Sequence, residues 1–291
     1  MINKDRLITT FCDIVQVDSP SGEEEAMAQD LSSRLTALGF ITSRDNHGNL
    51  LASEEGSNPL MLSAHLDTVN PGRGIKPQVV GNIIQSDGTT ILGGDCKAGI
   101  AAVLEALEVI KEDGASRIPV QLIFTRGEEI GLVGARNLDF SMVQAKQAVV
   151  FDGNGPVSMV TTASPTYIRF DVQITGRSAH AGVEPEKGLS AIKIAADIIS
   201  NLPQGRLDDE TTINVGSISG GSVRNTVPEE ATFSGEFRSR STETLDLLRL
   251  QISAALDTAR EQYVEAKIVE DLNVEFHTYT LPNDHEMVQR A

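Results

Sequence analysis

Two adjacent glutamates, Glu128 and Glu129, stand three residues after the apolar run "PVQLIF" and at the start of a glycine-rich turn. A carboxylate at the end of a buried strand is costly to desolvate unless a positive charge lies beside it. Successive residues of a strand point to opposite faces, so we expect the two glutamates to do different work. One would bind a cation, and the other would stay free to act as a general base.

A histidine and an aspartate, His65 and Asp67, follow another apolar run in "SAHLDTV". Two residues apart in an extended segment, they point to the same side. A metal-bound imidazole usually donates its other N–H to a carboxylate, although Asp67 could equally bind a metal directly. The alternative is a surface histidine and a helix cap.

Two further acids complete the set of possible ligands: Asp95 in "ILGGDCKAGIAA" and Asp152 in "KQAVVFDGNG". Asp95 alone is as typical of a helix N-cap. Together with His65 and Glu129, however, these acids would repel one another unless cations neutralised them. Imidazole with carboxylates suits zinc, with manganese or cobalt as substitutes, and a pair of such ions acidifies water. We therefore predict two divalent metal ions.

The elements that must position these residues alternate in type. Apolar runs that end in polar residues predict strands within 60–67, 120–129 and 146–155, and helical spacing predicts a helix from Ile100 to Ile110. This order favours an α/β layered sheet, in which ligands lie at the carboxyl ends of the strands. All the candidate residues fall at such ends.

Near the amino terminus, Ser21 and Glu24 have the spacing of a capping box. Ser21 precedes the helix-like run 23–38 and Glu24 lies in its first turn, and Gly39 should end the run. We therefore predict that the two side chains cap this helix.

The second half of the chain has a different texture, with alternating strands and two amphipathic helices. Strands are expected at 166–176, 211–221, 229–239 and 265–276, and helices at 189–202 and 242–264. The order β-α-β-β-α-β is ferredoxin-like. An exposed edge of such a sheet can pair with a copy of itself, so a homodimer is expected. We place the catalytic domain at 1–161, the inserted domain at 162–280, and the start of a return segment at 281–291.

Composition excludes several classes of partner. The 291 residues include 41 acidic and 24 basic side chains, a net charge of -17, which repels nucleic acid and anionic lipid. We find neither a membrane-length apolar stretch nor a secretory signal. The two cysteines, Cys12 and Cys96, suit a reducing compartment. We expect a cytoplasmic protein without membrane or nucleic-acid partners.

Five segments in order, "SAHLDTV", "GGDCKAGIAA", "TRGEEIGLVGA", "VFDGNG" and "GRSAHAGVEPEKG", resemble the M20 family of dinuclear zinc peptidases and deacylases. The chain looks closest to the peptidase T-like (tripeptide aminopeptidase-like) branch. The resemblance implies a zinc-peptidase-like α/β/α catalytic domain with an inserted lid domain, through which members of the family commonly dimerise. It also implies hydrolysis of peptide bonds in short peptides.

The resemblance assigns roles to the candidate residues. It implies that His65 and Asp152 bind the first metal, Glu129 the second, and Asp95 both. Glu128 becomes the general base, and Asp67 orients His65. In the family, an aspartate at the position of Asp152 is associated with aminopeptidases.

Three residues of the inserted domain match family motifs. The resemblance implies that His180, in "SAHAG", stabilises the oxyanion of the reaction, often in the partner subunit's site. It implies that Asn225 and Arg238 bind substrate, and an arginine can grip a peptide carboxylate with two hydrogen bonds. Without the resemblance, they would be a loop histidine, a turn asparagine and a strand arginine.

The sequence departs from the family pattern in two places. Cys96 stands where the family usually has a second acid after the bridging aspartate, which leaves the local hydrogen bonding open. Family members also continue further and supply a final histidine ligand, so we expect a truncated chain that lacks the C-terminal part of the catalytic domain and binds one metal poorly. An N-acyl amino acid deacylase and a catalytically impaired metal-binding, dimerising remnant remain alternatives.

Overall fold

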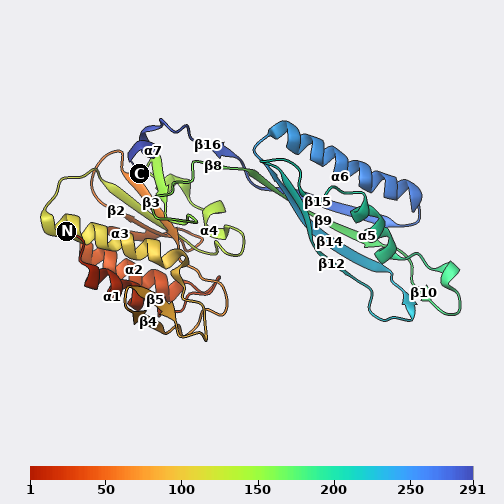
Figure 1. Ribbon diagram of the computed structural model, residues 1–291, viewed down its shortest axis with the longest axis horizontal. Coiled ribbons are helices and arrows are strands. Elements are labelled where there is room, and N and C mark those ends of the chain that lie inside the picture. Colours follow the sequence, from red (N-terminus) through yellow and green to blue (C-terminus); the bar gives the residue numbers. More distant parts are fainter. Residues whose placement is uncertain (291) are drawn as a thin grey trace. The chain divides into compact units, whose positions relative to one another are not determined.

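The structure is a computed structural model that describes residues 1–290 (Figure 1). Ala291, the last residue of the predicted return segment, lies outside the described residues. The chain divides into two compact units, Met1–Met159 and a second unit that begins at Val160. Each has its own hydrophobic core.

The first unit is built on a five-stranded sheet with the order β1-β2-β6-β3-β7. Its strands are β1 (Ile41–Arg44), β2 (Leu50–Ser53), β3 (Leu60–His65), β6 (Val120–Thr125) and β7 (Gln147–Val150). β3 runs parallel to both β6 and β7, whereas β2 runs antiparallel to β6 and to β1. The carboxyl ends of β6, β3 and β7 therefore meet at one edge of the sheet, as the α/β prediction requires.

Three helices cover one face of this sheet: α1 (Lys4–Val15), α2 (Glu25–Leu38) and α3 (Gly94–Asp113) (Figure 1). Strand β6 shows the alternation that produces this layer, because Leu122 and Phe124 belong to the core under the helices. On the opposite face, the Gln121 side chain donates a hydrogen bond to the carbonyl of Met142. That carbonyl belongs to the short helix η1 (Phe140–Met142), which follows α4 (Val133–Arg136).

The predicted cap of α2 is wrong. Helix α2 begins at Glu25 without a side-chain cap, because Ser21 and Glu24 make their hydrogen bonds to other segments. Asp95, for which a helix N-cap was the alternative, lies inside α3, whose N-cap is Gly93 and which has no side-chain cap. Asp95 and Cys96 have non-helical dihedral angles, so α3 is kinked there. The Asp95–Cys96 peptide bond is cis. Before α3, the chain forms a hairpin of β4 (Pro77–Val80) and β5 (Ile83–Ser86).

The second unit is a ferredoxin-like domain, as predicted. In chain order it contains β9 (Thr166–Thr175), α5 (Ala191–Ser200), β12 (Thr212–Gly220), β14 (Glu230–Ser239), α6 (Thr242–Gln262) and β15 (Lys267–Phe276). The antiparallel sheet has the order β11-β12-β14-β9-β15, with β11 at Gly205–Arg206. Both helices pack on one face of it, against a core that includes Phe170, Phe233 and Phe237.

Short elements complete the second unit. β8 (Ala163–Ser164) pairs with β16 (Tyr279–Thr280), so the chain enters and leaves the sheet side by side. β10 (Ala179–His180) pairs with β13 (Thr226–Val227), and the turn η2 (Pro185–Lys187) and helix α7 (Glu286–Arg290) lie outside the sheet. Over residues 1–290, none of the helices has the length and apolar character that crossing a membrane would require.

Candidate metal centre

The parallel strands bring the candidate ligands together at one edge of the first unit. His65 is the last residue of β3, Glu128 and Glu129 follow β6, and Asp152 follows β7. Asp95 joins them from the start of α3. Because parallel strands end at the same edge, residues far apart in the sequence become neighbours.

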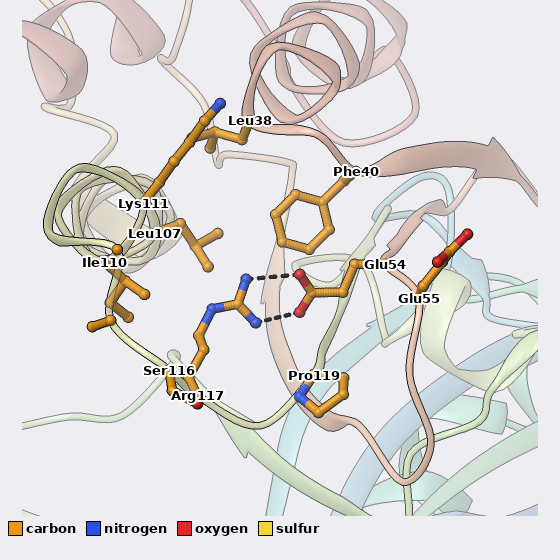
Figure 2. Close-up of a pocket in the computed structure, with 12 residues that line it drawn as sticks. Leu38, Phe40, Glu54, Glu55, Leu107, Ile110, Lys111, Ser116, Arg117 and Pro119 are labelled. Atoms are coloured by element: carbon orange, nitrogen blue, oxygen red, sulfur yellow. Dashed lines mark hydrogen bonds and ion pairs between the residues drawn. The ribbon is translucent and has the colours of Figure 1, made fainter.

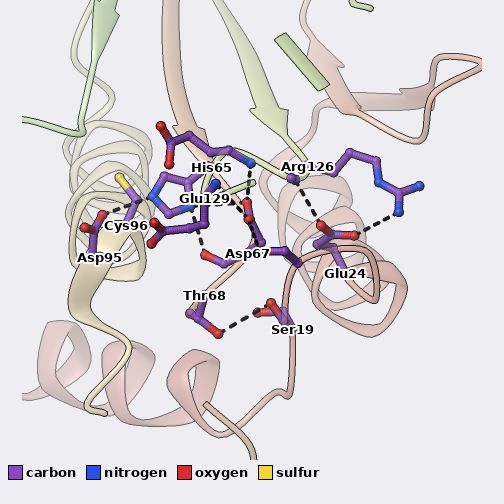
Figure 3. A network of polar contacts seen from close by, with 12 residues as sticks. Ser19, Glu24, His65, Asp67, Thr68, Asp95, Cys96, Arg126 and Glu129 are labelled. Atoms are coloured by element: carbon purple, nitrogen blue, oxygen red, sulfur yellow. Dashed lines mark hydrogen bonds and ion pairs between the residues drawn. The ribbon is translucent and has the colours of Figure 1, made fainter. Parts of the chain in front are cut away.

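The donor atoms form two groups that share His65. The first contains His65, Asp95, Cys96 and Asp152, and the second contains His65, Glu128 and Glu129; within each, the donor atoms lie within 4.8 Å of one another. His65 Nε2 lies 3.0 Å from Asp95 Oδ1 and 3.8 Å from Asp152 Oδ1 (Figure 3). The imidazole is buried, with 2% of its surface exposed.

The charges in this cluster do not balance without a cation. Burial raises the pKa of Glu128, Glu129 and Asp152; a protonated His65 lowers it, and the neighbouring carboxylates raise it further. Burial lowers the pKa of His65, but its hydrogen bonds with Asp67 and Asp95 outweigh this and raise it to about 9. Divalent cations would remove this repulsion, and imidazole with carboxylates is a donor set that zinc and manganese accept. The residues present therefore fit a divalent metal site.

Asp67 contacts both His65 and the turn that carries the two glutamates. Its backbone carbonyl lies 2.9 Å from His65 Nδ1, whereas its nearest carboxylate oxygen lies 3.5 Å away. The carboxylate instead accepts hydrogen bonds from Ser21 Oγ at 2.7 Å and from the backbone N–H groups of Glu128 at 2.9 Å and Glu129 at 3.2 Å. Burial raises the pKa of Asp67, but these bonds and His65 lower it to about 2. An ionised Asp67 thus anchors the turn that carries both glutamates.

Cys96 supplies the hydrogen bond that the sequence left open. Its thiol donates to the carbonyl of Phe151, the residue before Asp152. Burial, and then the charge of Asp152, raise the pKa of the thiol to about 12. The side chain is therefore a neutral thiol that joins the start of α3 to the end of β7.

Within the second unit, His180 and Asn225 lie close together. His180 pairs with Thr226 across β10 and β13, and the N–H of Ala181 donates to the carbonyl of Asn225 at 2.9 Å. Both side chains are exposed. The structure thus gathers two of the three predicted substrate-contacting residues of this domain on one small ribbon.

Arg238 lies elsewhere in the second unit. It is eight residues along β14 from Glu230, about 26 Å at the usual rise of a strand, whereas Asn225 lies shortly before Glu230. Its guanidinium donates to both carboxylate oxygens of Glu236, at 3.1 and 2.9 Å, and lies 4.2 Å from the ring centre of Tyr167. A substrate carboxylate at this position would have to compete with Glu236.

A hollow of about 460 Å³ lies away from the cluster, near the amino end of β6 (Figure 2). Phe40 and Leu107 supply apolar walls, and Arg117 pairs with both carboxylate oxygens of Glu54. Glu54 also accepts the N–H of Val120 at 2.6 Å. Arg117 and Glu54 are thus paired with each other within the chain, and none of the candidate metal ligands lines this hollow.

Two sequence profiles match the chain. The peptidase dimerisation domain of the M20 family matches residues 162–264, within the ferredoxin-like unit. The profile of peptidase family M28 matches residues 48–166, which contain all the candidate ligands. The two parts of the chain thus each match a profile of a peptidase family.

Individual proteins give the same result over nearly the whole chain. YqjE of Bacillus subtilis is 39% identical over 270 residues, which cover 89% of this chain and 73% of YqjE. The crystal structure of a tripeptidase from Staphylococcus aureus has a TM-score of 0.93 at 34% identity, covering 99% of this chain and 80% of the other. Aminopeptidase PepT from Bacillus cereus has a TM-score of 0.88 at 36% identity, with the same coverage. With its cluster of acids around one histidine and its ferredoxin-like second unit, this chain therefore belongs to the M20 family of peptidases, in the peptidase T-like branch, and is a hydrolase.

Proposed function

We propose that the chain hydrolyses peptide bonds of short peptides, as an aminopeptidase or tripeptidase, with two divalent metal ions of which zinc is the best fit. The observation that most supports this function is that two groups of possible metal ligands share His65 at the carboxyl ends of the strands. The names of the two similar solved structures, a tripeptidase and an aminopeptidase, support the same substrate class. Asp152, rather than a glutamate, agrees with this class.

Four residues would hold the metals: His65 and Asp152 the first, Glu129 the second, and Asp95 both. Such ions, when bound, supply Lewis acidity and lower the pKa of water. The buried imidazole and the ionised Asp67 behind it keep the ligands in place. The protein thus fixes the donor positions before substrate arrives.

Glu128 is the general base in this proposal. Its pKa is raised by burial, and a carboxylate with a raised pKa is a better proton acceptor near neutral pH. It takes a proton from the attacking water as the water oxygen bonds to the peptide carbonyl carbon. It then gives a proton to the amide nitrogen as the C–N bond breaks.

The second unit would contribute to substrate binding in a homodimer. The match to the peptidase dimerisation domain supports this part. His180 would donate a hydrogen bond to the oxyanion, a contact typically worth about 3 to 4 kcal/mol in the transition state. Asn225 and Arg238 would contact the substrate, Arg238 after exchanging Glu236 for a peptide carboxylate.

Replacement of the base tests this function. Glu128→Gln should lower kcat for a tripeptide by about 10²- to 10⁴-fold while the bound metal per chain stays unchanged. Glu25→Gln is a matched control, because the Glu25 side chain is 83% exposed and pairs only with Arg44 in the described contacts. Full activity of Glu128→Gln would overturn the assignment of the base.

The substrate class needs its own experiment. A panel of tripeptides, dipeptides and N-acyl amino acids separates a peptidase from the alternative deacylase, because both would use the same metal ligands. We expect the highest kcat/KM with tripeptides that have a free amino terminus. Preference for N-acyl amino acids would contradict the aminopeptidase assignment.

A further inference from the structure

We propose that Ser21 and Glu24, in the loop between α1 and α2, are positioning residues that brace the turn carrying Glu128 and Glu129. This inference rests on the proposed role of Glu128 as the base. The pair has the spacing of a helix-capping box, yet α2 has no side-chain cap. Helix capping therefore does not explain why these two polar residues are where they are.

Ser21 acts on the turn through Asp67. Its hydroxyl donates to Asp67 Oδ2 at 2.7 Å, and the same oxygen accepts the N–H of Glu129 at 3.2 Å. The other oxygen of Asp67 accepts the N–H of Glu128 at 2.9 Å. Ser21 thus fixes the orientation of the Asp67 carboxylate, which accepts the backbone N–H groups of Glu128 and Glu129.

Glu24 holds the turn directly. Its carboxylate is buried, with 3% of its surface exposed, and Oε1 accepts the N–H of Gly127 at 3.0 Å and of Gly22 at 2.8 Å. Arg126 lies against the other oxygen, with Nη2 at 3.2 Å, and also donates to the carbonyl of Gly22 (Figure 3). A buried carboxylate is costly unless it is paired; here Oε1 accepts two N–H groups, and Oε2 makes an ion pair with Arg126 but accepts no hydrogen bond.

The turn is neither helix nor strand, and its own backbone hydrogen bonds run from the N–H groups of 131–134 to the carbonyls of 126–128. Gly127 has a φ of +59°, a conformation that favours glycine, and the following residues leave the strand. On its other side, Asn49 accepts the N–H of Arg126 at 3.2 Å and donates to the carbonyl of Gly134 at 2.9 Å. Ser21, through Asp67, and Glu24, through Gly127, therefore add hydrogen bonds to the turn beyond those that Asn49 makes.

Hydrogen exchange and kinetics of three variants test the brace. Ser21→Ala removes the donor to Asp67, and Glu24→Gln places an amide N–H₂ among donors. We expect both to speed exchange in the peptide 126–132 by about tenfold, because the turn opens more readily. We also expect kcat to fall by about tenfold with KM within about twofold, since the base is displaced and not the substrate. Ser21→Thr keeps the hydroxyl and should restore both values.

Glu25→Gln, next to Glu24 but exposed, should leave exchange and kcat unchanged. A lower melting temperature in Ser21→Ala and Glu24→Gln, with wild-type exchange in 126–132 and wild-type kcat, would overturn the proposal. Failure of the proposed function is distinguishable from this result. It would appear as full activity of Glu128→Gln, whereas failure of the brace alone leaves Glu128→Gln inactive and the two brace variants like wild type.

Discussion

At the scale of single residues, His65 shows what the site requires. Both donor groups include its imidazole, and the acids around it raise its pKa to about 9. With this raised pKa, His65 keeps its proton at neutral pH, because no other positive charge neutralises the carboxylates around it. A bound metal would replace that proton, because a ligating imidazole must be neutral.

The carboxylate of Asp67 gives a prediction for stability in acid. Its pKa of about 2 lies below the usual value of 3.8, so its contribution is present above pH 3.8 and is lost as the pH falls through 2. The shift corresponds to about 2 kcal/mol. In urea unfolding of metal-free protein, Asp67→Asn should be less stable than wild type at pH 5, and the difference should shrink by pH 2. A difference that is the same at both pH values would contradict this role.

Residue types at strand ends were sufficient to predict that these side chains would gather at one edge of the sheet, since His65, Glu129 and Asp152 follow apolar runs. The partners of Asp67 could not be predicted in the same way. Ser21 lies 46 positions from Asp67 and the N–H of Glu128 lies 61 positions from it, so only the folded sheet and the α1–α2 loop bring them together. Local spacing predicted that Ser21 and Glu24 form a capping box, but their side chains make hydrogen bonds to Asp67 and Gly127 instead.

At the scale of elements, the contact between α3 and the end of β7 sets the positions of Asp95 and Asp152. The N–H of Phe151 donates to the carbonyl of Ser63 at 2.8 Å, and the Cys96 thiol donates to the carbonyl of Phe151. Both ligands are next to these contacts in the sequence. The periodicity of the sequence predicted which segments are strands and which are helices. It could not predict that the start of α3 lies against the end of β7, because that depends on which elements become neighbours in the fold.

Gly99 permits that approach. A Cβ at this position would lie 2.6 Å from Phe151 Cβ and 2.7 Å from the Phe151 carbonyl oxygen. We expect Gly99→Ala to lower the free energy of unfolding by about 1 to 3 kcal/mol and to weaken metal binding, despite the better helix propensity of alanine. Gly94→Ala is the control, because a Cβ there meets no atom within 4 Å. Thermal unfolding and metal titration measure both effects; equal behaviour of the two variants would contradict the packing argument.

At the scale of the whole molecule, the chain forms two compact units, each with its own hydrophobic core. Alternation and helical spacing predicted the ferredoxin-like order of the second unit, because its central strands β9 and β14 have one buried and one more open face. The pairing of β10 with β13, which joins His180 to the neighbourhood of Asn225, had no local signal in the sequence. Short strands of two residues lack a period that could be recognised.

The dimer gives a prediction by complementation. If His180 acts in the partner subunit's site, His180→Ala and Glu128→Gln should each be nearly inactive alone. After mixing, unfolding and refolding together, random pairing should restore about a quarter of wild-type activity, because half of the dimers are mixed and each has one complete site. No recovery from dimers that demonstrably exchange subunits would place His180 in its own chain's site.

We infer that divalent cations hold the acids around His65 together. Equilibrium dialysis of metal-stripped protein against zinc, with Asp95→Ala beside the wild type, tests it most directly, since Asp95 is the proposed shared ligand. We expect tight zinc binding by the wild type and at least about tenfold weaker binding by Asp95→Ala. Equal zinc binding by the two proteins, or none by the wild type, would contradict it.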